Sequence, residues 1–215
     1  MNEVRRALLD AYRGIEPLLT SDELKERWNE ESALADFPVG ALAGHLVRAG
    51  AAVVSYLAAG MPEEEPVAAP VYYSTVLAAM DASDHNEVVS RGQDVAGASA
   101  DDLLATFRRT VDELEQALTR EPAERVVKVY RGIVLRLDDY LLSRLCEVLI
   151  HTDDLAVSLD LEPPAIPAAA GDLAITHLVD VARTWHGDRG VLIALSRKER
   201  DHADALNVFK PVPRG

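Results

Sequence analysis

Residues 138–161, DDYLLSRLCEVLIHTDDLAVSLDL, contain the strongest folding signal in this 215-residue chain. Drawn as a helix at about 100 degrees per residue, the segment places its polar side chains in one narrow stripe and apolar side chains around most of its remaining surface. A helix of this kind is buried on most sides. The stripe lacks the lysine that is common on solvated faces, and it consists of Tyr140, Arg144, Glu147, His151, Asp154 and Ser158. The pattern predicts a buried helix over about 137–160 whose polar stripe faces either water or an internal site.

Further helical patterns lie on both sides of this segment. Pro38 precedes an apolar run that ends at Gly60, and Ser99 is a suitable N-cap for a later helix. The sequence thus predicts additional helices over 3–30, with a break near Pro17, and over 39–59, 99–118 and 168–186. We expect residues 61–98 to be mainly irregular, with one short helix. Residues 124–136 could form a hairpin or an extended crossing, and residues 191–195 a strand or a helix.

The break EPPAIP at 162–167 divides the chain. We expect a mainly α protein in which residues 1–161 form a four-helix bundle and residues 162–215 form a short helical extension packed on it.

The composition limits the classes of partner. The net charge of −14 disfavours nucleic acid and anionic membrane surfaces, because both would repel an acidic protein. The N-terminus has no apolar core of a signal peptide, and no apolar run approaches the length needed to cross a bilayer. The lone cysteine, Cys146, fits a reducing compartment and is interpreted as a buried packing residue. We therefore expect a cytoplasmic protein that could form a homodimer and that binds neither nucleic acid nor membrane.

Glu147 and His151 stand one helical turn apart in the polar stripe, with Cβ atoms about 6 Å from each other. This spacing lets a carboxylate oxygen and an imidazole nitrogen bind one metal ion. His45, in the otherwise apolar segment 39–59, is a candidate third ligand, although such a histidine taken alone is more often a core residue that donates to a backbone carbonyl. Small residues on its face, Ala41, Ala49 and Ala52, leave room for a ligand or for a closely packed helix.

Two stretches, FPVGALAGHLVRAG at 37–50 and DDYLLSRLCEVLIHTDDLAVSLDL at 138–161, resemble the DinB-like four-helix metalloenzymes related to the mycothiol-dependent maleylpyruvate isomerases. The resemblance implies a DinB-like four-helix bundle in which His45, Glu147 and His151 bind a divalent ion, with zinc as the first expectation and nickel as the alternative. It also implies a low-molecular-weight thiol as cosubstrate. The chain departs from the family where a tryptophan often follows the proline before the second helix, since Val39 and Gly40 stand there. Its C-terminal region is also shorter than that of the maleylpyruvate isomerases.

Three protein ligands leave a position open on the ion, which is the pattern of a catalytic rather than a structural site. Asp154 is then a candidate to accept the second ring proton of His151, and Arg144 to orient Glu147 or to bind a substrate anion. Tyr140 is a candidate general acid or a core aromatic residue. Together Tyr140, Arg144 and Asp154 are the predicted catalytic residues.

The first functional hypothesis is a divalent-metal-dependent enzyme that uses a mycothiol-like thiol for S-transfer to a small electrophile or for isomerisation. Two alternatives share its ligands. One is a non-catalytic metal-binding or sensor bundle, and the other is a hydrolase whose nucleophile is a metal-bound water.

Overall fold

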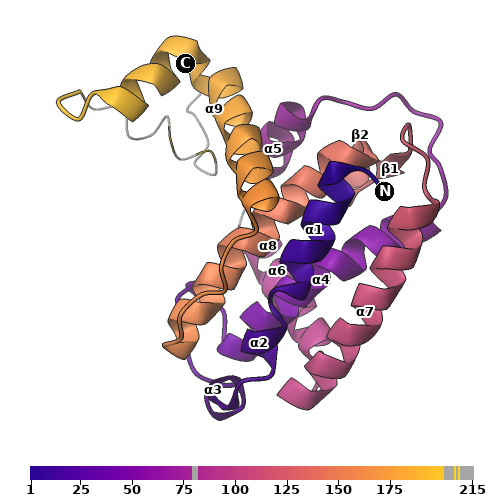
Figure 1. The fold of residues 1–215 in the computed structure, drawn as a ribbon, viewed down its shortest axis with the longest axis vertical. Helices are drawn as coiled ribbons and strands as arrows, with labels where there is room; N and C mark the ends of the chain where they lie inside the picture. Colours follow the sequence, from indigo (N-terminus) through magenta and orange to yellow (C-terminus); the bar gives the residue numbers. More distant parts are fainter. Residues whose placement is uncertain (79–81, 201–205, 207, 209–215) are drawn as a thin grey trace.

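Helices make up most of the structure (Figure 1). The structure is a computed structural model that describes residues 1–78, 82–200, 206 and 208. The helices within these residues are α1 (Glu3–Arg13), α2 (Glu16–Leu19), α3 (Asp22–Glu26), α4 (Val39–Ala58), α5 (Ala69–Ala78), α6 (Ala82–Ala96), α7 (Ala100–Arg120), α8 (Leu137–Leu159) and α9 (Ala168–Ser196). Strands β1 (Val126–Lys128) and β2 (Val134–Arg136) flank a single 3-10 turn at Tyr130–Gly132. The expected mainly α class is confirmed, and the predicted helix over 3–30 is divided into α1, α2 and α3.

Four of these helices, α1, α4, α7 and α8, pack against one another as the bundle. Helices α4 and α1 each contact both α7 and α8. The core between them is apolar, and the rings of Tyr12 on α1 and Phe107 on α7 lie 5.2 Å apart within it. The hydroxyl of Tyr12 donates a hydrogen bond of 2.6 Å to the carbonyl of Val47 on α4. Helix α8 is thus enclosed on most sides, as its apolar circumference predicts.

Helix α4 is more apolar than expected. An 18-residue window of this 20-residue helix has a mean hydropathy of 1.3, which is enough by length and composition to cross a membrane, so the expectation that no apolar run approaches this length was wrong. However, 61% of the apolar window is buried inside the structure, where α4 contacts α6, α7 and α8. This burial is typical of a central core helix, and it explains why the helix carries few charges.

The segment 61–98 is the main correction to the predicted elements. One short helix was expected there and is present as α5, but α6 is a second helix, and the two occupy most of the described residues of the segment. Helix α6 packs closely on α4 through two glycines. A Cβ atom at Gly44 would lie 2.1 Å from the carbonyl oxygen of Gly92, and one at Gly92 would lie 2.6 Å from that of Ala41. Backbone contact at this distance leaves no room for side chains. The contact therefore gives no apolar stripe in the sequence of α6 from which the helix could be predicted.

The region 124–136 is a hairpin, one of the two predicted alternatives. Its strands are antiparallel, with Val127 opposite Leu135. The turn has positive φ at Arg131 (60°) and Gly132 (73°), the left-handed conformation that glycine adopts at little cost. The hairpin places Tyr130 beside the cavity described below.

Helix α9 extends through 191–195, so that segment is helical and not a strand. Gly187 interrupts it with φ 70° and ψ 161°, a backbone conformation essentially restricted to glycine. Before this kink α9 packs on α1 and α8, and after it the helix turns away from the bundle (Figure 1). The last part of the predicted C-terminal extension lies outside the described residues.

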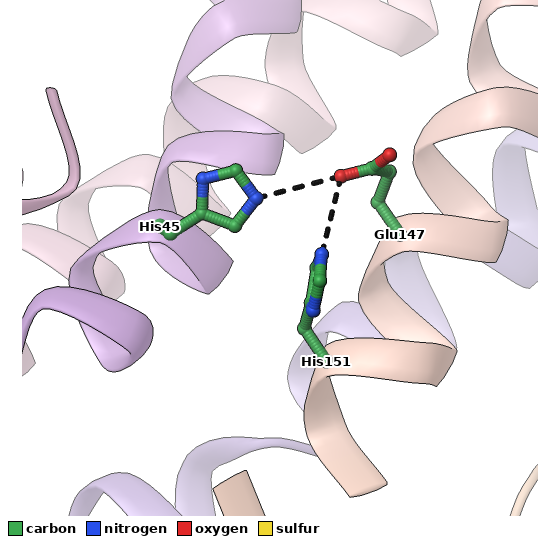
Figure 2. A group of neighbouring side chains, drawn as sticks. All are labelled: His45, Glu147 and His151. Carbon is green, nitrogen blue, oxygen red and sulfur yellow. Dashed lines mark ion pairs between the residues drawn. The ribbon is translucent and has the colours of Figure 1, made fainter. Parts of the chain in front are cut away.

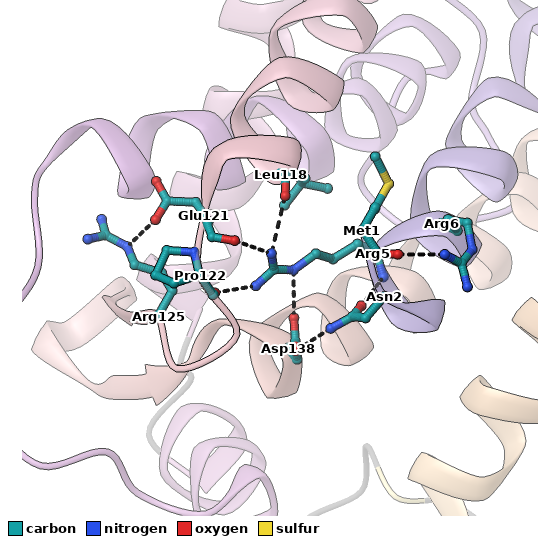
Figure 3. Close-up of polar contacts among 9 residues, drawn as sticks. All are labelled: Met1, Asn2, Arg5, Arg6, Leu118, Glu121, Pro122, Arg125 and Asp138. Carbon is teal, nitrogen blue, oxygen red and sulfur yellow. Dashed lines mark hydrogen bonds and ion pairs between the residues drawn. The ribbon is translucent and has the colours of Figure 1, made fainter.

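A buried arginine, Arg5, links three distant segments of the bundle (Figure 3). Its side chain is 4% exposed and donates hydrogen bonds to the carbonyls of Leu118, Glu121 and Pro122, at the end of α7. It also pairs at 3.0 Å with Asp138, in the first turn of α8. Arg5 thereby satisfies carbonyl groups that the end of a helix leaves unpaired.

Candidate metal centre and the adjoining cavity

The polar stripe of α8 faces an internal site. Glu147 and His151 project from α8 toward His45 on α4, and the three side chains meet between the two helices (Figure 2). One potential ligand atom from each residue lies within 4.8 Å of the other two. We call these three residues the donor cluster. They are the only set of this kind found among the described residues.

The distances within the donor cluster suit a shared ion better than direct hydrogen bonds. Oε2 of Glu147 lies 3.5 Å from Nε2 of His45 and 3.5 Å from Nε2 of His151. These separations exceed the usual 2.7–3.2 Å of an N–H···O hydrogen bond. Two ligand atoms at about 2.1 Å from a tetrahedral zinc ion lie about 3.4 Å apart. The residues present therefore fit a divalent ion.

Burial and charge in the donor cluster also favour a cation. Burial would raise the pKa of the Glu147 carboxyl, but the Arg144 charge and the contacts with both histidines outweigh it and hold that pKa well below its usual range. Burial lowers the pKa of His45. For His151, burial is outweighed by the contacts with Asp154 and Glu147, which raise its pKa to about 9. Two carboxylates thus favour positive charge at His151, whether a proton or a metal ion supplies it.

Asp154 and Arg144 flank the donor cluster on α8. Oδ2 of Asp154 lies 2.9 Å from Nδ1 of His151, so the pair forms the contact that the spacing on the helix suggests. Nη2 of Arg144 lies 3.9 Å from Oε1 of Glu147, at the long limit of an ion pair, and its guanidinium lies 5.1 Å from the centre of the Tyr140 ring. Tyr140 is buried among aromatic residues, and burial raises the pKa of its hydroxyl. It therefore stays protonated at neutral pH.

The donor cluster opens onto a cavity of about 280 Å³. This volume suits a small molecule rather than a macromolecule. Several lining residues were not predicted from the sequence: Arg48, Tyr72, Tyr73, Val76, Asp84, Val88, Arg91 and Tyr130. Arg48 could have been found, because it is the only charged residue in 39–58 and stands three positions after His45. The others come from α5, α6 and the hairpin, where no local pattern indicates which side faces the site.

Cys146, which neighbours Glu147 in sequence, does not belong to the site. Its side chain is buried, and Sγ lies 3.9 Å from the carbonyl oxygen of Ala174 on α9. Burial raises the pKa of the thiol to about 12. The prediction of a packing residue rather than a nucleophile is consistent with both observations.

Residues 19–156, well over half of the chain, match the family model described as the mycothiol maleylpyruvate isomerase N-terminal domain. Two solved structures are similar to the chain: a mycothiol-dependent maleylpyruvate isomerase and a histidine-to-alanine mutant of that enzyme. Both are 18% identical, with a TM-score of 0.55. The alignments cover 87% of this chain and 71% of the first structure, and 86% and 70% for the mutant. No curated protein matches. The likeness shows a shared fold and confirms the expected DinB-like bundle.

Proposed function

The chain belongs to the family of the mycothiol maleylpyruvate isomerase N-terminal domain, and from this membership we propose that it is a divalent-metal-dependent enzyme that uses a low-molecular-weight thiol. Its reaction is the transfer of that thiol to a small electrophile, or the isomerisation of a double bond through transient addition of the thiol. The single observation that supports this proposal best is the donor cluster, because it combines three metal-ligand side chains with an adjoining cavity of about 280 Å³. We propose that the enzyme works in the cytoplasm.

His45, Glu147 and His151 would hold the ion, with zinc as the first candidate and nickel as the second. Such an ion lowers the pKa of a thiol that binds to it, so that the thiol is a strong nucleophile near neutral pH. Three protein ligands leave room for the thiol.

The neighbouring side chains have distinct proposed roles. Asp154 would accept the Nδ1 proton of His151, which leaves Nε2 of the ring free to bind an ion. Arg144 would keep Glu147 ionised through its positive charge. Tyr140, protonated at neutral pH, could donate a proton or a hydrogen bond to charge that develops on the electrophile.

A thiol-transfer assay tests the proposal. Zinc-loaded protein is incubated with mycothiol and a fluorogenic haloalkyl bimane, and conjugation is followed against a reaction without protein. Glu147→Gln should abolish the catalysed rate, while Glu115→Gln, which removes the same charge from an exposed site on α7, should retain it. Absence of turnover with any low-molecular-weight thiol, together with a zinc-dependent melting temperature, would instead indicate a binding bundle. Hydrolytic turnover that needs no thiol would indicate a hydrolase.

A further inference from the structure

One wall of the cavity is a single face of α6. Asp84, Val88 and Arg91 all line the cavity, and their spacing of four and three residues places them on the same side of the helix. At one end of this face α6 lies against the donor cluster, since a Cβ atom at Gly92 would be 3.4 Å from the backbone nitrogen of His45. Asp84, in the first turn of α6, stands eight positions before Gly92 and therefore about 12 Å away along the helix axis. The wall thus extends about 12 Å from the donor cluster.

The tip of the β1–β2 hairpin meets α6 at this far end. The hydroxyl of Tyr130 donates a hydrogen bond of 2.8 Å to Oδ1 of Asp84, and Nη2 of Arg131 lies 2.8 Å from both oxygens of the same carboxylate. The side chain of Asp84 is only 13% exposed. A charge pair with a partner this buried is screened less by water and salt than a pair on the open surface. Asp84 therefore joins the hairpin tip to α6.

The ring of Tyr130 is held in place as well as its hydroxyl. The guanidinium groups of Arg91 and Arg131 lie 5.1 Å and 5.4 Å from the centre of the ring, within the range of a cation–π contact. Tyr130 lines the cavity and is also partly exposed to solvent. This is the arrangement expected of a side chain that separates a cavity from the solvent.

The backbone of the hairpin tip adopts a conformation that favours glycine, yet an arginine stands there. Arg131 has φ 60° and ψ 20°. A residue with a Cβ atom enters this left-handed region at a cost in free energy, and it stays there where the surrounding contacts favour it. The contacts of Arg131 with the Asp84 carboxylate and the Tyr130 ring are of this kind. Backbone and side chains together fix the position of Tyr130.

We propose that Tyr130 is a specificity-determining residue, which forms the end wall of the cavity and limits the length of the ligand. Asp84 and Arg131 are positioning residues that hold Tyr130 in place. The inference rests on the proposed function, in which the electrophile that reacts at the donor cluster occupies this cavity. A wall about 12 Å from the donor cluster admits compact molecules and excludes longer chains. The electrophile should therefore be short and carry no long substituent.

Binding of straight-chain alcohols measures the length of the cavity without requiring turnover or metal. Zinc-free protein is titrated calorimetrically into 1-butanol and its homologues up to 1-tetradecanol. Each carbon that fits should raise the affinity about fourfold, the effect of burying one CH2 group. We expect the increase to stop at about eight to ten carbons, because each carbon advances an extended chain by somewhat less than the C–C bond length of about 1.5 Å.

Tyr130→Ala should let the increase continue for about two further carbons or more, because the missing ring leaves space at the end of the cavity. Tyr130→Phe is the matched control, since it keeps the ring and the contact between Arg131 and Asp84, and it should stop at the wild-type length. Asp84→Asn, which removes the charge that Arg131 contacts, should also admit longer alcohols. Its control is Asp180→Asn, which removes the same charge from an exposed ion pair on α9.

A wild-type affinity that rises up to the longest alcohol would overturn the proposal, and this comparison needs no variant. An equal length limit for Tyr130→Ala and the wild type would do the same. Equal limits for Asp84→Asn and Asp180→Asn would remove the positioning role of Asp84. The thiol-transfer assay tests the proposed function separately, because the length limit of the zinc-free protein depends on neither a metal nor a thiol.

Discussion

Asp154 contacts the donor cluster from outside, through Nδ1 of His151 at 2.9 Å. A carboxylate at this position fixes the ring so that Nε2 points toward Glu147, and it makes the ring a stronger ligand. We predict that Asp154→Asn binds zinc about ten- to a hundredfold more weakly than the wild type. Competition with a chromophoric chelator measures the affinity. Asp153→Asn is the control, because Asp153 is the adjacent exposed residue and loses the same charge. Identical zinc affinities of the two variants would refute the role given to Asp154.

Among the helices, the packing of α6 on α4 determines where the cavity-lining residues of α6 lie. A methyl group at Gly92 would approach the backbone oxygen of Ala41 to 2.6 Å, so Gly92→Ala must displace one helix from the other. We predict a loss of about 1–3 kcal/mol in the free energy of unfolding, as for other overpacked cores. Gly171→Ala in α9 is the comparison, where the new methyl group meets only the side chain of the exposed Ile166 at 3.3 Å. Urea denaturation measures both, and a Gly92→Ala protein as stable as wild type would contradict the described packing.

The elements that the sequence predicts well are those whose signal is local. The stripe of α8 places Glu147, His151 and Asp154 together because all three lie on one helix, and residues three or four apart are neighbours. Helices α4 and α7 also begin at their predicted caps, Pro38 and Ser99. Helix α5 corresponds to the one short helix expected within 61–98, whereas α6 was missed because it packs on α4 through glycine. The approach of His45 to α8 depends on tertiary packing, so the sequence indicated it through family resemblance.

Some sequence-based hypotheses stay predictions. They are the bound metal, the catalytic roles of Tyr140, Arg144 and Asp154, the homodimer, and the division between residues 161 and 162. The structure brings Tyr140 and Arg144 to the cavity, while Asp154 contacts it through His151. Their chemical roles depend on a ligand, and the tests above address them.

At the scale of the whole molecule, Arg5 joins the beginning of the chain to the end of α7 and the start of α8, over 113 to 133 positions of sequence. We predict that Arg5→Met lowers the free energy of unfolding by about 3–5 kcal/mol, because it leaves carbonyl groups at the end of α7 without their donor and removes one of the two partners of Asp138, which Asn2 still contacts. Arg13→Met on the same helix removes an exposed ion pair with Glu115 and should cost less than about 1 kcal/mol. Similar denaturation midpoints for the two variants would show that the Arg5 contacts contribute little.

The proposed function requires that α4 and α8 together hold one divalent ion at the donor cluster. The most direct test is elemental analysis of purified wild-type protein, His45→Ala and the control His177→Ala, after loading with zinc and removal of free metal. His177 is a buried histidine of α9 whose ring lies 5.5 Å from Tyr73 and outside the donor cluster. We expect close to one zinc per chain in the wild type and in His177→Ala, and little in His45→Ala. Equal zinc content in His45→Ala and wild type would show that the donor cluster does not hold the ion.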